Sequence, residues 1–267
     1  LRGAGDGLGK VALGQSLTAD HVLRFQDLLP HASYELATYA LAELFTRKDE
    51  AEIAELRKAG HAIDAVHAQV PQLLQAGRTE AEVAHELEKL ILQEHSVIDF
   101  VIVGSGPNGA NPHHSFSDRV LAEGEPVVVD IGGTLPSGYH SDCTRTYVVG
   151  GDISTAPQDF QDAYAVLADA QAAARAAAHP GSTAADIDAI TRQAISAAGW
   201  GDYFVHRTGH GIGLSTHEEP FIMEGNDLAL EEGMAFSIEP GIYLEGKWGM
   251  RLEDIVVLTN DGYESLN

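Results

Sequence analysis

Hydrophobic residues recur at helical spacing through the stretch DEAEIAELRKAGHAIDAVHAQVPQLLQAG, which begins at Asp49. The apolar positions follow mixed spacings of three and four residues, and they are Ile53, Leu56, Ile63, Val66, Val70 and Leu73. This period favours one long amphipathic helix, which Gly77 ends. Upstream, KVALG predicts a short strand, residues 18–29 predict a helix, and YELATYALAELF adds a second apolar stretch. Residues 1–48 are too few for an independent core.

A helix-capping pattern occurs twice along the chain. TEAE places Thr79 three residues before Glu82, and STAAD places Thr183 three residues before Asp186. In both, the hydroxyl and the acid can form a reciprocal capping box at the start of a helix. The two motifs are 104 residues apart. Amphipathic helices can resemble one another by chance, but the match continues into the strands that follow, which indicates an internal duplication.

Those strand patterns carry carboxylates at matching positions. EGEPVVVDIGG resembles EEGMAFSIEPG, which matches Asp130 with Glu239, and Asp142 in HSDCTRTYVV falls opposite Glu253 in MRLEDIVVL. Each half therefore predicts two helices, a strand with an acid and a returning strand with another acid.

Each acid taken alone has an ordinary structural explanation. Asp130 can cap the turn at GG, Asp142 can pair with Arg145, and Glu253 can pair with Arg251. Matched positions in two halves disfavour these explanations.

Acids at the ends of buried apolar strands need a partner, because an unpaired buried charge is costly. Two carboxylates about 4 Å apart repel by roughly 4 kcal/mol at an effective dielectric near 20. Two divalent cations would balance four carboxylates, and a neutral histidine would add a ligand without changing that balance. Mixed oxygen and imidazole donors suit manganese, cobalt, iron or zinc better than magnesium or calcium. Ions about 3.5 to 4 Å apart let one hydroxide bridge them and attack a polarised carbonyl, which is the chemistry of a hydrolase.

Three of the chain's 13 histidines lie within HRTGHGIGLSTHEEP, residues 206–220. Glycines rather than core-forming residues separate them. A single histidine is usually structural, but three in one loop-like stretch indicate a site.

Composition excludes several classes of function. Forty acidic residues against 16 basic ones give a formal charge of -24, a field that repels nucleic acids and anionic membranes and attracts cations. The only cysteine, Cys143, cannot form an intramolecular disulfide. No stretch approaches a membrane-spanning length, and LRGAGDGLGK lacks the pattern of a signal peptide. We therefore expect a soluble, cytoplasmic protein without nucleic-acid or membrane partners.

In this order, the segments VVVDIGG, GYHSDCTRTY, HRTGHGIGLSTHEEP, FSIEPGIY and GMRLEDIVVLT resemble the pita-bread metallopeptidases, and within them the Xaa-Pro branch of prolidases and aminopeptidases P. The resemblance implies an α+β fold in which two pseudo-symmetric αβ halves surround a curved antiparallel sheet. It implies a catalytic domain over residues 49–267, with residues 1–48 as the remnant or short form of an N-terminal domain. The hairpin tip TLPSGY is one residue longer than is common in the family, and an insertion there leaves both strands in phase.

The resemblance also implies a ligand set. Asp130 would chelate one metal, Asp142 and Glu253 would bridge both, and His210 and Glu239 would complete the shell of the other. Glu239 would also accept the proton of the attacking water.

Further matching residues surround this shell. Thr144 would supply a hydroxyl that steadies the bridging oxygen, unless it is simply a strand-forming residue. His113 in NPHHSFSDR would shuttle a proton or hold the developing oxyanion, with His114 as the alternative. His217 would be a second such helper, and His206 would line the pocket for proline and its carboxylate.

Arg251 and Tyr243 also match the Xaa-Pro branch and would contact the substrate. RLED favours proline-directed cleavage over methionine aminopeptidases, which tend to have a glutamine-containing segment before the final glutamate. The implied protein is a homodimeric exopeptidase that uses two divalent ions, manganese first and otherwise cobalt, zinc or iron, on proline-containing di- or oligopeptides. The alternatives are a methionine or broad-specificity aminopeptidase on the same fold, and a catalytically silent pita-bread binding protein.

Overall fold

The computed structural model describes residues 9–14 and 17–267, so LRGAGDGL at the N-terminus lies outside the described residues. The chain separates into two compact units, Leu1–Phe45 and Thr46–Asn267. The first unit confirms the strand predicted at KVALG, which pairs in parallel with a second strand, and the helix predicted near residues 18–29. Its elements are β1 (Lys10–Leu13), α1 (Ala19–Leu28), β2 (Ser33–Leu36), α2 (Ala37–Ala40) and all but the last residue of α3 (Ala42–Thr46).

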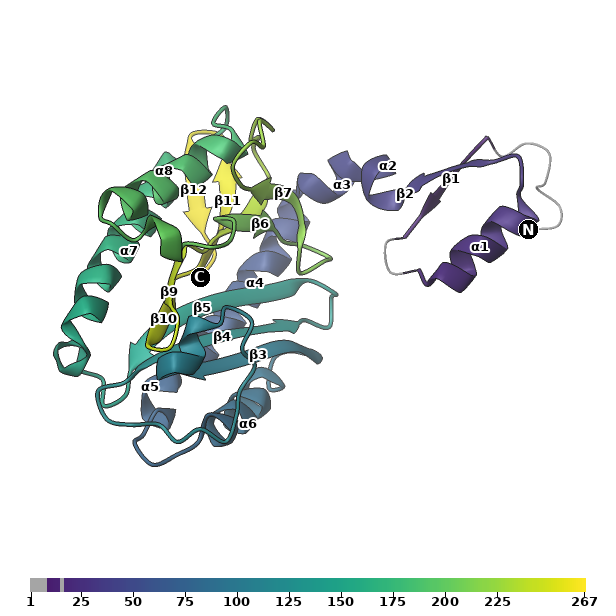
Figure 1. Cartoon of the computed structure of the whole chain (residues 1–267). Helices are drawn as coiled ribbons and strands as arrows, with labels where there is room; N and C mark the ends of the chain where they lie inside the picture. Colours follow the sequence, from purple (N-terminus) through teal and green to yellow (C-terminus); the bar gives the residue numbers. More distant parts are fainter. Residues whose placement is uncertain (1–8, 15–16) are drawn as a thin grey trace. The chain divides into compact units, whose positions relative to one another are not determined.

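The first half of the large unit is a three-stranded antiparallel sheet in the order β3-β4-β5, against which helices α4 and α6 pack (Figure 1). Its apolar core lies between these helices and the sheet. The elements are α4 (Glu50–His67), α5 (Val70–Leu73), α6 (Glu80–Ile91), β3 (Val97–Ser105), η1 (Gly106–Ala110), β4 (Pro126–Thr134) and β5 (His140–Val148).

The prediction of one long helix ending at Gly77 is wrong, because the helix ends at His67 and a separate short helix follows. Pro71 explains the break. It has no N–H to donate to the carbonyl of His67, and its ring would clash with that carbonyl in a continuous helix. Pro71 lies instead in the first turn of α5, where no such hydrogen bond is needed.

The second half consists of helices α7 and α8 on an antiparallel sheet of five strands, in the order β12-β11-β8-β6-β7, with β9 and β10 as a separate hairpin. Both predicted capping boxes are present, at the starts of α6 and α8. The elements are η2 (Ile153–Thr155), α7 (Gln158–Ala177), α8 (Ala184–Ala197), η3 (Gly201–Tyr203), β6 (Gly209–Gly211), β7 (Glu218–Ile222), β8 (Ala235–Ile238), β9 (Gly241–Leu244), β10 (Trp248–Arg251), β11 (Asp254–Thr259) and β12 (Gly262–Ser265).

Strand register brings the predicted acids to one place. In the β4–β5 hairpin Asp130 lies opposite Thr144, and the pairing stays in phase up to the tip over residues 135–139. Asp142 and Thr144 are two residues apart, so their side chains share a face of the sheet. The N–H of Glu253 donates to the carbonyl of Thr144 at 3.1 Å. The three-stranded and five-stranded sheets therefore meet where the acids lie.

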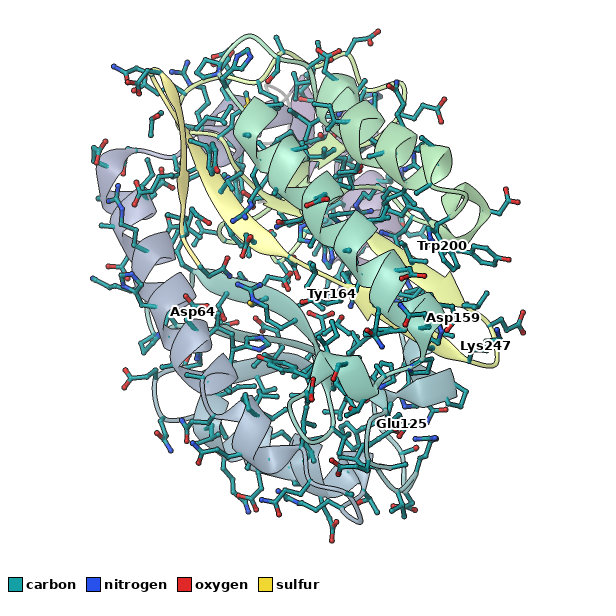
Figure 2. All side chains as sticks on the ribbon, turned by 90° about the vertical axis from the view of Figure 1, so that its left-hand side faces the viewer. Asp64, Glu125, Asp159, Tyr164, Trp200 and Lys247 are labelled. Carbon is teal, nitrogen blue, oxygen red and sulfur yellow. The ribbon has the colours of Figure 1, made fainter. Side chains whose placement is uncertain are left out.

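The hairpin β9–β10 is held against the start of α7. Asp159 accepts hydrogen bonds from Trp248 Nε1 at 3.2 Å and from Lys247 Nζ at 3.3 Å. The ring of Trp248 also contacts Phe160 edge-on and packs near Trp200. Figure 2 shows Asp159, Lys247 and Trp200 gathered at this end of the helix. Within residues 9–14 and 17–267, no helix has the length and apolarity to cross a bilayer.

Candidate metal centre

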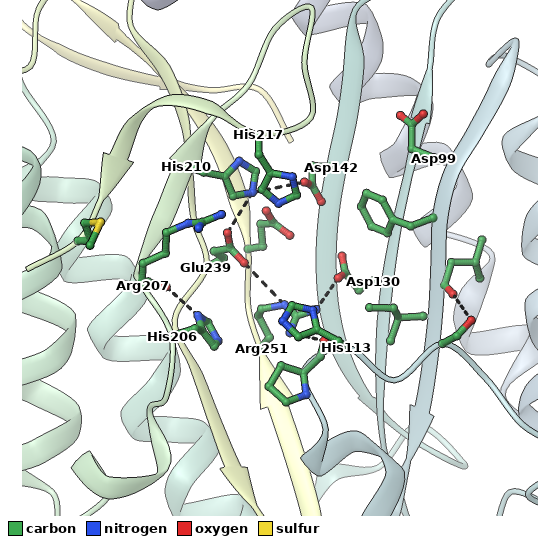
Figure 3. Close-up of a pocket in the computed structure, with 17 residues that line it drawn as sticks. Asp99, His113, Asp130, Asp142, His206, Arg207, His210, His217, Glu239 and Arg251 are labelled. Atoms are coloured by element: carbon green, nitrogen blue, oxygen red, sulfur yellow. Dashed lines mark hydrogen bonds and ion pairs between the residues drawn. The ribbon is translucent and has the colours of Figure 1, made fainter. Parts of the chain in front are cut away.

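A pocket of about 810 Å³ opens beside the junction of the two sheets, and residues of both halves line it (Figure 3). All five predicted metal ligands lie on its wall, together with four of the other predicted site residues. The ligands are Asp130, Asp142, His210, Glu239 and Glu253, and the others are His113, His206, His217 and Arg251.

Within the pocket, His210 is the centre of the acid cluster. Its Nε2 atom lies 3.1 Å from Glu239 Oε1 and 3.6 Å from Asp142 Oδ2. Donor atoms of Asp142, His210 and Glu253 all lie within 4.8 Å of one another. These three side chains are buried and could hold a metal ion together.

The donor set fits divalent cations by a second observation. Among the described residues, Asp130 Oδ1 and Glu253 Oε1 are buried and have no hydrogen-bond partner. Buried carboxylate oxygens are almost always satisfied, because an unpaired one bears its full desolvation penalty. Oxygens of this kind, next to an imidazole nitrogen, are the ligands that manganese, iron, cobalt and zinc accept.

Electrostatics in the cluster also call for positive charge. Burial raises the pKa of Asp142 well above its ordinary value, and repulsion from Glu253 and Asp130 raises it further. Burial and the neighbouring acids likewise raise the pKa of Glu253. Burial also opposes the ionisation of Glu239, but the hydrogen bond with His210 and the nearby His210, His206 and Arg251 side chains together outweigh it and lower the pKa of Glu239 to about 2. The cluster thus combines an acid that stays ionised with others that repel one another.

The glycines beside His210 have a steric explanation. A Cβ at Gly209 would lie 1.9 Å from the carbonyl oxygen of Ser237, and one at Gly211 would lie 2.2 Å from the carbonyl oxygen of Glu219. Strand β6 is therefore squeezed between its neighbours β8 and β7. Ser237 Oγ accepts from the N–H of His210 at 3.0 Å and donates to Glu239 Oε1 at 3.0 Å. One hydroxyl thus orients two predicted ligands.

Arg251 crosses the site from β10. Its Nη2 atom pairs with Asp130 Oδ2, its Nε atom donates to Thr144 Oγ1 at 3.0 Å, and Nη1 donates to the hydroxyl of Tyr243 at 2.7 Å. The hydroxyl of Thr144 in turn donates to Glu253 Oε2 at 2.8 Å. Thr144 therefore contacts a predicted ligand directly.

The simple ion pairs considered for the acids do not form among the described residues. Arg145 pairs with Asp254 at 2.8 Å rather than with Asp142. Arg251 pairs with Asp130 rather than with Glu253. The sequence did not indicate these partners. Arg145 reaches from β5 to β11, and Arg251 reaches from β10 to β4.

The other three predicted histidines differ in what they contact. His217 packs on His210 with ring centroids 4.0 Å apart, and burial, then the neighbouring His210, lower its pKa to about 4. His206 Nε2 lies 2.9 Å from the hydroxyl of Tyr243, and burial lowers the pKa of His206. His113 lines the pocket, in front of Arg251 in Figure 3.

Sequence patterns missed Asp99 and Arg207, which also line the pocket. Asp99 accepts from Thr134 Oγ1 at 2.7 Å and lies 2.7 Å from His140 Nδ1. Its one sequence signal is that it interrupts the apolar run VIDFVIV. Arg207 lies in the stretch that contains three histidines, and no sequence pattern distinguishes it from its neighbours.

Comparisons with known proteins gave matches that cover nearly the whole chain. The model of metallopeptidase family M24 matches residues 54–260. The chain is 55% identical over 257 residues to a Mycobacterium tuberculosis protein named "Probable dipeptidase PepE", which covers 96% of this chain and 67% of that protein. It is 40% identical over 254 residues to the Xaa-Pro dipeptidase of Lactobacillus delbrueckii subsp. lactis, covering 93% of this chain and 67% of the relative.

Solved structures agree with these sequences. The dipeptidase PepE of Mycobacterium ulcerans superposes with a TM-score of 0.91 at 53% identity, covering 97% of this chain and 68% of the other. The prolidase of Pyrococcus furiosus superposes with a TM-score of 0.88 at 34% identity, covering 96% of this chain and 75% of the other. The chain thus corresponds to roughly two thirds to three quarters of each of these proteins.

Proposed function

The chain belongs to metallopeptidase family M24, and from this premise we propose that it is an exopeptidase that hydrolyses the bond between an N-terminal residue and a following proline. The α+β pita-bread fold and the hydrolase class expected from the sequence are confirmed by the family match and the prolidase structures. The observation that carries the proposal is the convergence of four carboxylates and His210 on one pocket. Relatives named Xaa-Pro dipeptidase support the preference for proline.

The metal site comprises Asp130, Asp142, His210, Glu239 and Glu253. Two divalent cations, which we propose to be manganese, would neutralise the four acids. When bound, they would polarise the scissile carbonyl and lower the pKa of water. The unpaired oxygens of Asp130 and Glu253 support this assignment of ligands.

Glu239 is the residue best placed to accept a proton. Its carboxyl is ionised throughout the neutral range, and Ser237 Oγ donates to its Oε1 atom at 3.0 Å. Its Oε2 atom lies 3.9 Å from Arg251 Nε, a weaker contact that leaves this oxygen available. Glu239 would take the proton from the attacking water and pass it on to the departing amine.

His113 and His217 would act on the substrate side of the cluster. His217 has a pKa of about 4 and is neutral at pH 7, so one ring nitrogen can donate a hydrogen bond while the other accepts. Such donors, aimed at the carbonyl oxygen, stabilise the negative charge that develops there.

Recognition of proline would rest on shape. The imide nitrogen of proline has no hydrogen to donate, so a pocket selects the ring and the bent backbone instead. His206 lines this pocket, whereas Tyr243 is buried beside it, with its hydroxyl 2.9 Å from His206 Nε2. The guanidinium of Arg251, which is held by Tyr243 and Asp130, supplies positive charge for the carboxylate of a dipeptide.

The experiment that tests this function compares Ala-Pro, Ala-Pro-Pro, Ala-Ala and Met-Ala-Ser as substrates of the manganese-loaded protein. We expect the proline peptides to be cleaved fastest, and the ratio of Ala-Pro to Ala-Pro-Pro separates a dipeptidase from an aminopeptidase. Cleavage of Ala-Ala as fast as Ala-Pro would assign a general dipeptidase, as the name of the mycobacterial relatives allows. Cleavage of Met-Ala-Ser alone, or absence of stoichiometric metal, would overturn the proposal.

We further propose that the protein is a homodimer and that residues 1–48 belong to an N-terminal domain distinct from the catalytic domain of residues 49–267. The division into units at residues 45 and 46 supports a boundary in this region. Light scattering after gel filtration tests the dimer, and a monomeric mass at micromolar concentration would refute it.

A further inference from the structure

The loop that presents His113 is anchored from behind. It runs over residues 106–119, and it places His113 on the wall of the pocket. The neighbouring His114 points the other way, and its Nε2 atom lies 2.9 Å from Glu80 Oε2. The alternative in which the two histidines exchange roles is therefore disfavoured, because only His113 faces the pocket.

Glu80 is the first residue of α6, and its side chain is fully buried. Oε1 accepts from the N–H of Ser105 at 2.7 Å, from Ser105 Oγ at 2.6 Å and from Asn108 Nδ2 at 3.1 Å. Oε2 accepts from Ser117 Oγ at 2.7 Å and lies 2.9 Å from the ring nitrogen of His114. The two oxygens of a carboxylate offer about four acceptor sites, and here all of them are used.

These donors have a common feature, since they flank His113 on both sides. Ser105 and Asn108 lie before it in the chain, and His114 and Ser117 lie after it. Capping of α6 does not need Glu80, because Thr79 and Glu82 already form the capping box. The buried carboxylate therefore serves the loop rather than the helix to which it belongs.

We propose that Glu80 is a positioning residue, which holds the 106–119 loop through His114 and its neighbours so that His113 faces the reacting groups. This inference rests on the role of His113 in the proposed function. Because His113 would act on charge that develops during the reaction, loosening its loop should lower kcat and leave KM for the substrate nearly unchanged. A displacement of about 1 Å can cost on the order of 100-fold in rate.

Two variants break the anchor by different routes. His114→Ala removes the partly exposed imidazole that contacts Glu80. Glu80→Gln replaces one acceptor oxygen with an NH₂ group, which would face the donors that the carboxylate now accepts from. Glu82→Gln is the matched control, because it makes the same substitution on the same helical turn without touching the loop. His114→Gln keeps an N–H that can reach the carboxylate and serves as the conservative rescue.

The manganese-loaded variants are compared by kcat and KM for Ala-Pro, metal content, thermal midpoint and hydrogen exchange over residues 106–119. For His114→Ala and Glu80→Gln we expect kcat to fall roughly tenfold or more, with KM and metal content within about twofold of wild type. Exchange in the loop should speed up. Glu82→Gln should keep the wild-type kcat, and His114→Gln should recover most of it.

His113→Ala completes the design. If the anchor acts through His113, adding Glu80→Gln to His113→Ala lowers kcat no further. The inference would be overturned if the kcat losses of the two single variants multiplied in the double variant. An unchanged kcat in His114→Ala would also overturn it. If His113→Ala itself keeps full activity, the role of His113 in the proposed function fails. If instead no peptide is cleaved even by wild type, the proposed function fails, and loop exchange still decides whether Glu80 is the anchor.

Discussion

Removing the metal should destabilise the protein by an amount that the site geometry predicts. The donor oxygens of Asp142 and Glu253 lie within 4.8 Å of each other. At that distance two ionised carboxylates repel by about 3.5 kcal/mol when the effective dielectric is near 20. Protonating one of them instead costs about 4 kcal/mol at pH 7 for an acid whose ordinary pKa is near 4. Repulsion and protonation cost similar amounts, and the folded metal-free protein must bear one of them. We therefore expect its free energy of unfolding to be about 3.5 kcal/mol lower than with metal bound.

For a domain of roughly 150 to 250 residues, each kcal/mol shifts the thermal midpoint by about 2 to 4 °C. A chelator should therefore lower the midpoint by about 7 to 14 °C at pH 7, measured by scanning calorimetry. At pH 5 protonation costs only about 1.5 kcal/mol, so the drop should shrink to about 3 to 6 °C.

The sign of this pH dependence follows from the pKa shifts. Asp142 and Glu253 have folded-state pKa values raised above those of the unfolded chain, first by burial and then by repulsion. The folded state therefore binds more protons than the unfolded state. Stability of the metal-free protein should fall as the pH rises from about 4 through the folded-state pKa values.

Asp142→Asn is the control for this prediction, because it removes one of the repelling charges. The metal-free variant should melt higher than metal-free wild type at pH 7, and added manganese should raise its midpoint little. A chelator that leaves the wild-type midpoint unchanged at pH 7 would refute the argument. So would a chelator-induced drop that is equally large in Asp142→Asn.

Four further changes probe the site. Glu239→Gln should lower kcat by about 10²- to 10⁴-fold with a small change in thermal midpoint. Asp142→Ala should lower kcat and also lose metal, as elemental analysis would show. Equal and small effects of the two substitutions would count against both assignments. Gly209→Ala should cost at least about 1 to 3 kcal/mol in chemical denaturation, because its Cβ would lie 1.9 Å from a carbonyl oxygen of β8, and wild-type stability would contradict the packing. Tyr243→Phe removes the hydroxyl that Arg251 contacts at 2.7 Å, so KM for Ala-Pro should rise more than kcat falls, and an unchanged KM would remove Tyr243 from substrate binding.

The sequence predicted that four acids would meet, and they line one pocket, because their positions follow from a repeated strand pattern. A duplicated strand pattern places an acid at the same point of each half, and alternation along β5 puts Asp142 and Thr144 on one face. Once the halves fold alike, the acids converge without further information. The capping boxes were predictable for the same reason, since each depends on residues three positions apart.

Contacts between residues far apart in the sequence were not predictable in this way. Glu80 and His114 are 34 positions apart, and Arg251 and Asp130 are 121 apart. Nothing in either local pattern says which acid an arginine will reach, and the simplest guess paired Arg251 with its neighbour Glu253. That guess fails because alternation along an extended strand would place both side chains on one face, but Arg251 ends β10 and Glu253 lies in the gap before β11. The break in the strand frees the guanidinium to bridge Asp130 and Tyr243, and among the described residues Glu253 Oε1 has no hydrogen-bond partner, which agrees with the proposed role of Glu253 as a metal ligand.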